Sequence, residues 1–204
     1  MGTHKGKVHI VDDDDAVRKS LQLLFRTVGI EAVAHASGDV FLDQFDDSVE
    51  GCILLDIRMP GMSGLEVQKQ LHERGSTLPI IFITGHGDVP MAVEAMQLGA
   101  FDFLQKPFRD QDLMDRVSRA LSENQEQREK SELQQEVTQR YESLTPREKE
   151  VMACVVKGQA NKVIAMDRDV SQRTVEIHRA RVMEKMQARS LADLVRMSIE
   201  IGLP

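Results

Sequence analysis

The sequence predicts two domains of different fold class: an α/β domain with a five-stranded parallel sheet, then an all-α domain. Up to about residue 120, short apolar runs alternate with helical patterns, and after residue 144 the pattern is helical throughout. Two of the apolar runs are continuous rather than alternating, which is typical of parallel strands covered on both faces. Strands that alternate with helices imply right-handed crossovers and a doubly wound sheet.

Five apolar runs are the predicted strands. They are VHIV, EAVAH, CILL, IIFI and FDFL, at residues 8–11, 31–35, 52–55, 80–83 and 101–104. Helical spacing between them is seen at Val17/Leu21/Leu24/Val28 and Leu65/Gln68/Leu71. Asp88, before Val89 and Pro90, has the position of an N-cap with proline in the first helical turn. These patterns predict helices that pack on the sheet.

A long helix is predicted to follow the last strand. After Leu121 the chain reads SENQEQREKSE, eleven residues without an apolar side chain, and Gly and Pro are absent from 108 to 145. Apolar residues then return at helical spacing, at Leu133, Val137, Tyr141 and Leu144. We expect one helix from about Asp110 to Glu142, whose residues 122–142 link a first domain (6–121) to a second domain (143–204).

The second domain is predicted to contain four helices. Thr145-Pro146-Arg147-Glu148 is typical of a helix start, because threonine at the N-cap and glutamate three positions later form a capping box. Gly158 ends this first helix. The further helices are expected over Asn161–Asp167, over Gln172–Gln187 and from about Ser190.

Composition and charge indicate a soluble protein with two tasks. Its 41% hydrophobic and 29% charged residues are ordinary for a globular protein. No apolar run approaches the roughly 20 residues that span a bilayer, and residues 1–7 lack the apolar stretch of a signal peptide, so we expect a cytoplasmic protein without a membrane role. Cys52 and Cys154 lack metal-ligand spacing and are predicted to be reduced core residues.

The net charge of −7 is unevenly distributed. Residues 143–204 hold 11 Lys and Arg against 8 Asp and Glu, so this part carries +3 and the remainder −10. An acidic first domain and a basic second domain suggest different binding tasks.

Charged and hydroxyl side chains follow the predicted strands at their carboxyl ends, where open α/β sheets form their functional crevice. They are Asp12 and Asp13, Asp56, Thr84 and Lys106, after the first, third, fourth and fifth strands. Aspartates beside a bound Mg²⁺ can act as nucleophiles toward phosphorus, and a hydroxyl and an ammonium can hold the phosphoryl oxygens. Aspartates alone would equally suit a helix N-terminus, because the helix dipole favours them. The joint order of these residues favours a phosphoryl site.

Three motifs in the first domain resemble the receiver domain of two-component response regulators. They are DIRMPGMSG (56–64), TGHGDVPM (84–91) and KPF (106–108). The resemblance covers residues 6–121 and implies a flavodoxin-like fold in which Asp56 accepts a phosphoryl group from a sensor histidine kinase. The implied Mg²⁺ ligands are Asp13, Asp56 and the backbone carbonyl of Arg58, with Asp12 assisting through water. Thr84 and Phe103 would form the switch pair, whereas Asp14 and Asp15 are assigned to the helix start.

The second domain resembles the LuxR-type helix-turn-helix. The motifs are LTPREKEVM (144–152), GQANKVIA (158–165) and SQRTVEIHR (171–179). Together with the receiver, they resemble FixJ-type transcriptional activators over the whole length. The resemblance implies promoter DNA and RNA polymerase as partners. Arg168 stands where the family prefers leucine, so we expect a second domain that is less stable on its own or that depends on the receiver for support.

The helix over 172–187 is predicted to lie in the major groove. Val175, His178, Val182 and Met186 form one stripe that should face the core. The predicted DNA contacts are Asn161, Lys162, Ser171, Arg173, Thr174, Glu176, Ile177, Arg179, Ala180, Arg181 and Lys185. The basic residues would hold phosphates, while Glu176 with Ile177 and Ala180 would reach base edges. Without the motif, a solvated helix of mixed charge would explain this face equally well.

Phosphorylation is predicted to form a homodimer through residues 89–104. Thr84 opens the loop into this segment and Phe103 lies within it, so a phosphoryl group that draws in Thr84 should reshape this surface. The alternative switch is the release of a helix-turn-helix that the receiver masks.

Two alternatives remain open. Asp13-x-Asp15-x-Val17 resembles the nucleophile motif of haloacid-dehalogenase-type phosphatases, although nothing beyond Lys106 supplies the later acidic pair of that family and Asp56 would have no role. A DNA-binding protein with a receiver that has no regulatory role would bind DNA independently of phosphate. We expect a regulator that is not an enzyme beyond its own phosphorylation and dephosphorylation.

Overall fold

The computed structural model describes residues 6–46, 49–85 and 89–203. The chain divides into two compact units, Met1–Arg128 and Glu129–Pro204. Within the described part, no helix is both long and apolar enough to cross a membrane.

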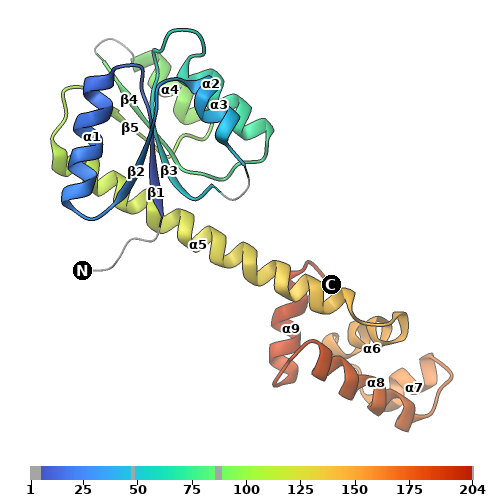
Figure 1. Cartoon of the computed structure of the whole chain (residues 1–204). Helices are drawn as coiled ribbons and strands as arrows, with labels where there is room; N and C mark the ends of the chain where they lie inside the picture. Colours follow the sequence, from blue (N-terminus) through green and yellow to red (C-terminus); the bar gives the residue numbers. More distant parts are fainter. Residues whose placement is uncertain (1–5, 47–48, 86–88, 204) are drawn as a thin grey trace. The chain divides into compact units, whose positions relative to one another are not determined.

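The first unit contains a parallel five-stranded sheet in the order β2-β1-β3-β4-β5 (Figure 1). The strands are β1 (Lys7–Val11), β2 (Glu31–His35), β3 (Gly51–Asp56), β4 (Ile80–Thr84) and β5 (Asp102–Gln105). The predicted fold class is confirmed. The five apolar runs coincide with the strands to within one residue at each end, and the fifth run begins one residue before β5. The strand order reverses between β1 and β3, which is the position where such sheets form their functional crevice.

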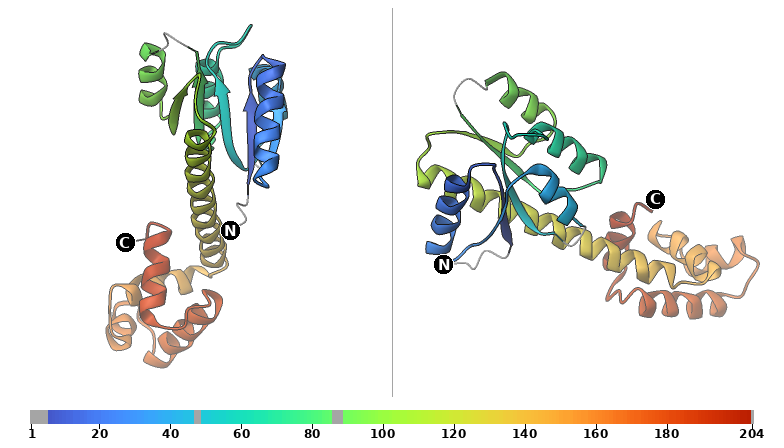
Figure 2. Two further views of the ribbon diagram at one scale, coloured as in Figure 1. Left: turned by 90° about the vertical axis from the view of Figure 1, so that its left-hand side faces the viewer. Right: turned by 45° about the horizontal axis from the view of Figure 1, so that its top comes forward.

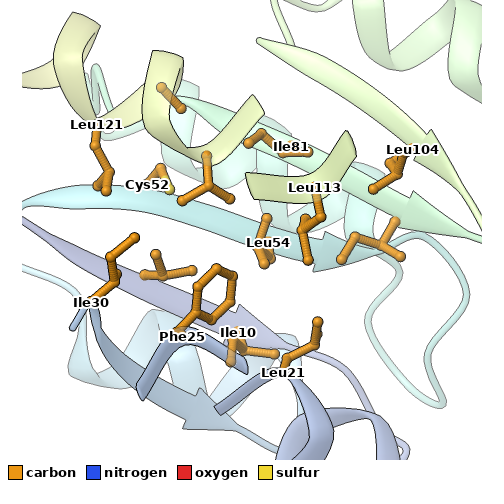
Figure 3. Close-up of a cluster of buried hydrophobic side chains, with 14 residues drawn as sticks. Ile10, Leu21, Phe25, Ile30, Cys52, Leu54, Ile81, Leu104, Leu113 and Leu121 are labelled. Carbon is orange, nitrogen blue, oxygen red and sulfur yellow. The ribbon is translucent and has the colours of Figure 1, made fainter. Parts of the chain in front are cut away.

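Helices cover both faces of the sheet, as Figures 1 and 2 show. They are α1 (Asp15–Thr27), α2 (Gly38–Gln44), α3 (Gly64–Glu73), α4 (Val89–Gln97) and α5 (Asp110–Glu142). α1 and the first turns of α5 pack on one face through buried residues such as Phe25 and Leu113 (Figure 3). α2, α3 and α4 pack on the other face, where Phe41, Val67 and Ala95 are buried. Both faces of the sheet are thus apolar, as the continuous strand patterns predict.

The second unit is helical, as predicted. After the last turns of α5 come α6 (Pro146–Val156), α7 (Asn161–Asp167), α8 (Gln172–Lys185) and α9 (Leu191–Glu200). Its core includes Val137 of α5 together with Met152, Ile164 and Val182. The capping box of Thr145 and Glu148 is present at the start of α6.

Arg168 does not enter this core. Its side chain is exposed and Nη1 donates to Glu150 Oε2 at 3.3 Å. Exposed ion pairs contribute little to stability, so the contact with Glu150 holds Arg168 at the surface but adds little to the free energy of unfolding. Of the cysteines, Cys52 is fully buried and Cys154 is half-buried, and both are free thiols.

Candidate functional site

Three charged side chains meet at the carboxyl end of the sheet. Lys106 Nζ donates to Asp12 Oδ2 at 2.9 Å and to Asp56 Oδ1 at 3.0 Å. Both aspartates are buried, with 3% and 8% of their surface exposed. Two buried carboxylates this close repel each other, and the shared ammonium between them offsets that repulsion.

The loop after β3 fixes the second carboxylate oxygen of Asp56. The backbone N–H of Arg58 donates to Asp56 Oδ2 at 2.8 Å, so both carboxylate oxygens are engaged. At Gly64 an added Cβ would lie 2.3 Å from the carbonyl oxygen of Asp56, so only glycine allows the start of α3 to approach this strand end. Ser63 and Glu66 then form the capping box that begins α3.

Burial and charge act in opposite directions at this site. Burial raises the pKa of the Asp56 carboxyl, and the hydrogen bond from Lys106 counteracts part of that rise. Burial also lowers the pKa of Lys106, but the hydrogen bonds to Asp12 and Asp56, together with the attraction of their charges, outweigh that effect and raise the pKa. Lys106 therefore stays a cation at neutral pH.

The four consecutive aspartates have four different environments. Asp12 is buried, and its Oδ1 accepts from the backbone N–H of Asp14 at 2.8 Å. Asp13 is exposed at the strand end. Asp14 is the N-cap of α1, where its Oδ1 accepts from the N–H of Ala16 at 2.8 Å. Asp15 begins the helix and forms an ion pair with Lys19 at 2.7 Å. The run is thus divided between the strand end and the helix start.

The proposed switch residues lie on neighbouring strands. Thr84 is the last residue of β4 and is 1% exposed, and its carbonyl oxygen accepts from the N–H of Lys106 at 2.7 Å. Phe103 is half-buried in β5 and lines an apolar pocket of about 490 Å³ with residues of α4. Residues 86–88 of the TGHGDVPM motif, including the N-cap expected at Asp88, lie outside the described residues.

The donor set at this edge suits Mg²⁺ by its chemistry, since carboxylate and carbonyl oxygens are the ligands this ion prefers. Among the described residues, no three acidic, histidine or cysteine side chains are already grouped around one point. Asp12 and Asp56 nevertheless share a cationic partner in Lys106, which shows that the edge favours positive charge.

On α8 the apolar stripe and the polar face separate as the sequence indicates. Val175, Val182 and Met186 are buried, and His178 is half-buried. The exposed residues on or before α8 that were expected to contact DNA are Ser171, Arg173, Glu176, Ile177, Ala180 and Arg181. Lys162 of α7 is also exposed, while Thr174 is half-buried and shares a 2.8 Å hydrogen bond with Ser171, the N-cap of α8.

Two basic residues of α8 make contacts that the sequence did not predict. Arg179 Nη1 donates to Asn161 Oδ1 at 3.1 Å, which ties α8 to α7. Lys185 Nζ donates to Glu148 Oε2 at 2.7 Å and to the carbonyl oxygen of Ser143 at 3.3 Å. Glu148 is 2% exposed, and the hydrogen bond from Lys185 is the main reason why its pKa is lowered to about 2. Lys185 thus joins α8 to the start of α6 rather than standing free for a phosphate.

Comparison with known proteins agrees with this geometry. The family model "Response regulator receiver domain" matches residues 8–118, and the model "Bacterial regulatory proteins, luxR family" matches residues 142–198. Transcriptional regulatory protein FixJ of Azorhizobium caulinodans is 49% identical over 96% of this chain and 93% of its own length. Nodulation protein W of Bradyrhizobium diazoefficiens is 47% identical over 98% of this chain and 88% of its own length.

Among solved structures, the response regulator StyR is similar with a TM-score of 0.90 and 42% identity, over 96% of this chain and 99% of that one. The strand order of the sheet and the residues at its carboxyl edge indicate the same family as these relatives. The chain belongs to the two-component response regulators that join a receiver domain to a LuxR-type DNA-binding domain.

Proposed function

We propose that this regulator is phosphorylated on Asp56 by a sensor histidine kinase and then controls transcription at promoter DNA. The contact of Lys106 with both Asp12 and Asp56 carries the proposal. A carboxylate held beside a fixed cation is placed to attack phosphorus, and the same cation can stabilise the phosphoryl oxygens. The family consists of transcription factors rather than enzymes, so the phosphatase alternative is wrong.

Mg²⁺ is the proposed cofactor. Asp13, Asp56 and the backbone carbonyl of Arg58 would bind it, and Asp12 would act through water. Asp13 is exposed just after the end of β1, which supports a direct ligand role for its carboxylate. When bound, the ion supplies the positive charge that polarises a phosphoryl group.

The proposed domain limits are 6–121 for the receiver, 122–142 for a helical linker and 143–204 for the DNA-binding domain. The unbroken helix α5, which runs from Asp110 to Glu142, supports a helical linker. For DNA contact we propose the exposed face of α8 around Arg173, Glu176 and Arg181. We propose promoter DNA and RNA polymerase as partners, and with them a cytoplasmic location.

We propose further that phosphorylation forms a dimer through residues 89–104, with Thr84 and Phe103 as the switch pair. Val93 and Met96 of α4 are about half exposed, at 52% and 47%, and line the apolar pocket with Phe103. Joining two DNA-binding modules raises avidity by roughly 10²–10⁴ without a new DNA contact. Sedimentation with and without beryllofluoride tests this. A mass that stays monomeric while DNA affinity rises would contradict it.

Phosphotransfer itself is tested with acetyl phosphate and Mg²⁺, followed by intact-mass measurement. The wild-type chain should gain the mass of one phosphoryl group, while Asp56→Asn, which is nearly isosteric but not nucleophilic, should gain none. Labelling of the Asn variant to the wild-type extent would exclude Asp56 as the acceptor.

A further inference from the structure

Arg18 reaches from α1 back to the end of β1. Its Nη1 donates to the backbone carbonyl oxygen of Asp12 at 2.7 Å, and its Nη2 donates to Asp15 Oδ1 at 3.2 Å. Although arginine side chains are usually solvated, only 14% of this one is exposed. The guanidinium thus holds a carbonyl on one side and a carboxylate on the other, which its planar fork of donors permits.

We propose that Arg18 is a positioning residue for the cation and phosphoryl site, acting through the peptide that joins Asp12 to Asp13. This inference rests on the proposed function of the acidic edge. The peptide unit is planar, so fixing the carbonyl of Asp12 also fixes the N–Cα bond from which Asp13 departs. Asp13 is exposed, so the direction of its backbone has a large share in deciding where its carboxylate points.

The rest of the turn is anchored in the same manner. The N–H of Asp12 donates to the carbonyl of His35 at 3.3 Å, and its two carboxylate oxygens accept from Asp14 N–H and Lys106. Arg18 adds the hold on the carbonyl that leads into Asp13. Asp15 in turn steadies the guanidinium, and Lys19 Nζ holds the other oxygen of Asp15 at 2.7 Å. These contacts fix the backbone of the Asp12–Asp13 turn before Mg²⁺ binds, as a preformed cation site requires.

Groups that orient metal ligands typically change metal affinity by roughly 10- to 100-fold when removed. We therefore expect Arg18→Gln to raise the Mg²⁺ dissociation constant of the unphosphorylated chain about tenfold, measured by titration calorimetry. Arg18→Lys keeps the positive charge but lacks the planar pair of N–H donor groups of the guanidinium. It should therefore show a similar loss of Mg²⁺ affinity. The Mg²⁺ concentration for half-maximal phosphorylation by acetyl phosphate should rise in parallel, while the rate at saturating Mg²⁺ changes far less.

Arg26→Gln is the matched control, because Arg26 is exposed in the last turn of the same helix. It should leave Mg²⁺ affinity unchanged. All variants are compared at a temperature at which circular dichroism shows them folded. If Arg18→Gln does not fold, the Mg²⁺ affinity of Arg18→Lys tests the proposal. Wild-type affinity in either Arg18 variant would overturn the positioning role. A wild-type chain that binds no Mg²⁺ and accepts no phosphoryl group would instead refute the proposed function.

Discussion

The side-chain oxygen of Asn124 accepts a hydrogen bond of 2.9 Å from the backbone N–H of Gly51. Asn124 is 5% exposed, although it belongs to the most polar stretch of the sequence. Gly51 has a φ of 112°, and an added Cβ would lie 1.8 Å from the carbonyl oxygen of Lys7, so no other residue fits. Because β3 begins at Gly51 and ends at Asp56, one strand connects the contact on α5 with the proposed phosphoacceptor.

Replacing Asn124 with leucine should destabilise the first unit. The substitution leaves the N–H of Gly51 buried without an acceptor, which costs about 1–3 kcal/mol. Urea denaturation should show this loss, and amide hydrogen exchange at Gly51 should accelerate. Gln127→Leu is the control, because Gln127 is exposed on the same helix and should change stability by less than about 0.5 kcal/mol. Equal effects of the two substitutions would show that the hydrogen bond is unimportant.

Lys106→Met should still permit phosphorylation but should uncouple it from DNA binding. Without the ammonium, the pKa of Asp56 should rise further, because the hydrogen bond and the positive charge of Lys106 no longer oppose the effect of burial. Phosphorylation requires the ionised carboxylate, so the acid limb of the pH–rate profile with acetyl phosphate should move to higher pH. An unchanged acid limb, or normal activation of DNA binding, would contradict this role of Lys106.

Arg181 and Lys185 should differ in their effect on DNA binding. Arg181 is exposed on α8, so Arg181→Ala should weaken binding to all DNA sequences and reduce the salt slope by about one unit. Lys185→Ala leaves the buried Glu148 without its ionic partner, so it should lower the free energy of unfolding with little effect on the salt slope. If Lys185→Ala reduces the salt slope as Arg181→Ala does, its ammonium contacts a phosphate after all.

The buried pair His9 and His35 should make the first unit sensitive to acid. The two rings stack, with Nδ1 of His9 3.3 Å from Nε2 of His35. Burial lowers the pKa of His35 to about 4 and also lowers the pKa of His9. The folded chain therefore binds these protons less readily than the unfolded chain. The free energy of unfolding should have its full value above about pH 6.5 and should decrease as the pH falls toward 4. His35→Leu should reduce this slope in urea denaturation, and an unchanged slope would assign it to other groups.

The sequence predicted what depends on local pattern. The five strands follow from continuous apolar runs, and α5 follows from the absence of Gly and Pro between 108 and 145. α2 was not predicted, because its seven residues carry Val40, Phe41 and Leu42 side by side instead of a helical repeat. The order of charged residues at the strand ends predicted that Asp12, Asp56 and Lys106 meet at the carboxyl edge.

Contacts between distant parts of the chain were beyond the reach of such patterns. Lys185 looked like one more basic residue of an exposed helix face, since nothing local shows that Glu148 is buried opposite it. Nothing in the local pattern marks Asn124 as buried, because its partner Gly51 lies 73 positions away. Arg18 fitted the regular pattern of α1, and only the structure shows its guanidinium on the carbonyl of Asp12.

The most direct test of the account is the affinity of the full-length chain for promoter DNA with and without beryllofluoride, for the wild type and for Asp56→Asn. Beryllofluoride mimics the phosphoryl group on an aspartate, so it should tighten binding by the wild type and leave the Asn variant unchanged. Equal affinity of the wild type in both conditions would contradict the claim that modification of Asp56 controls DNA binding.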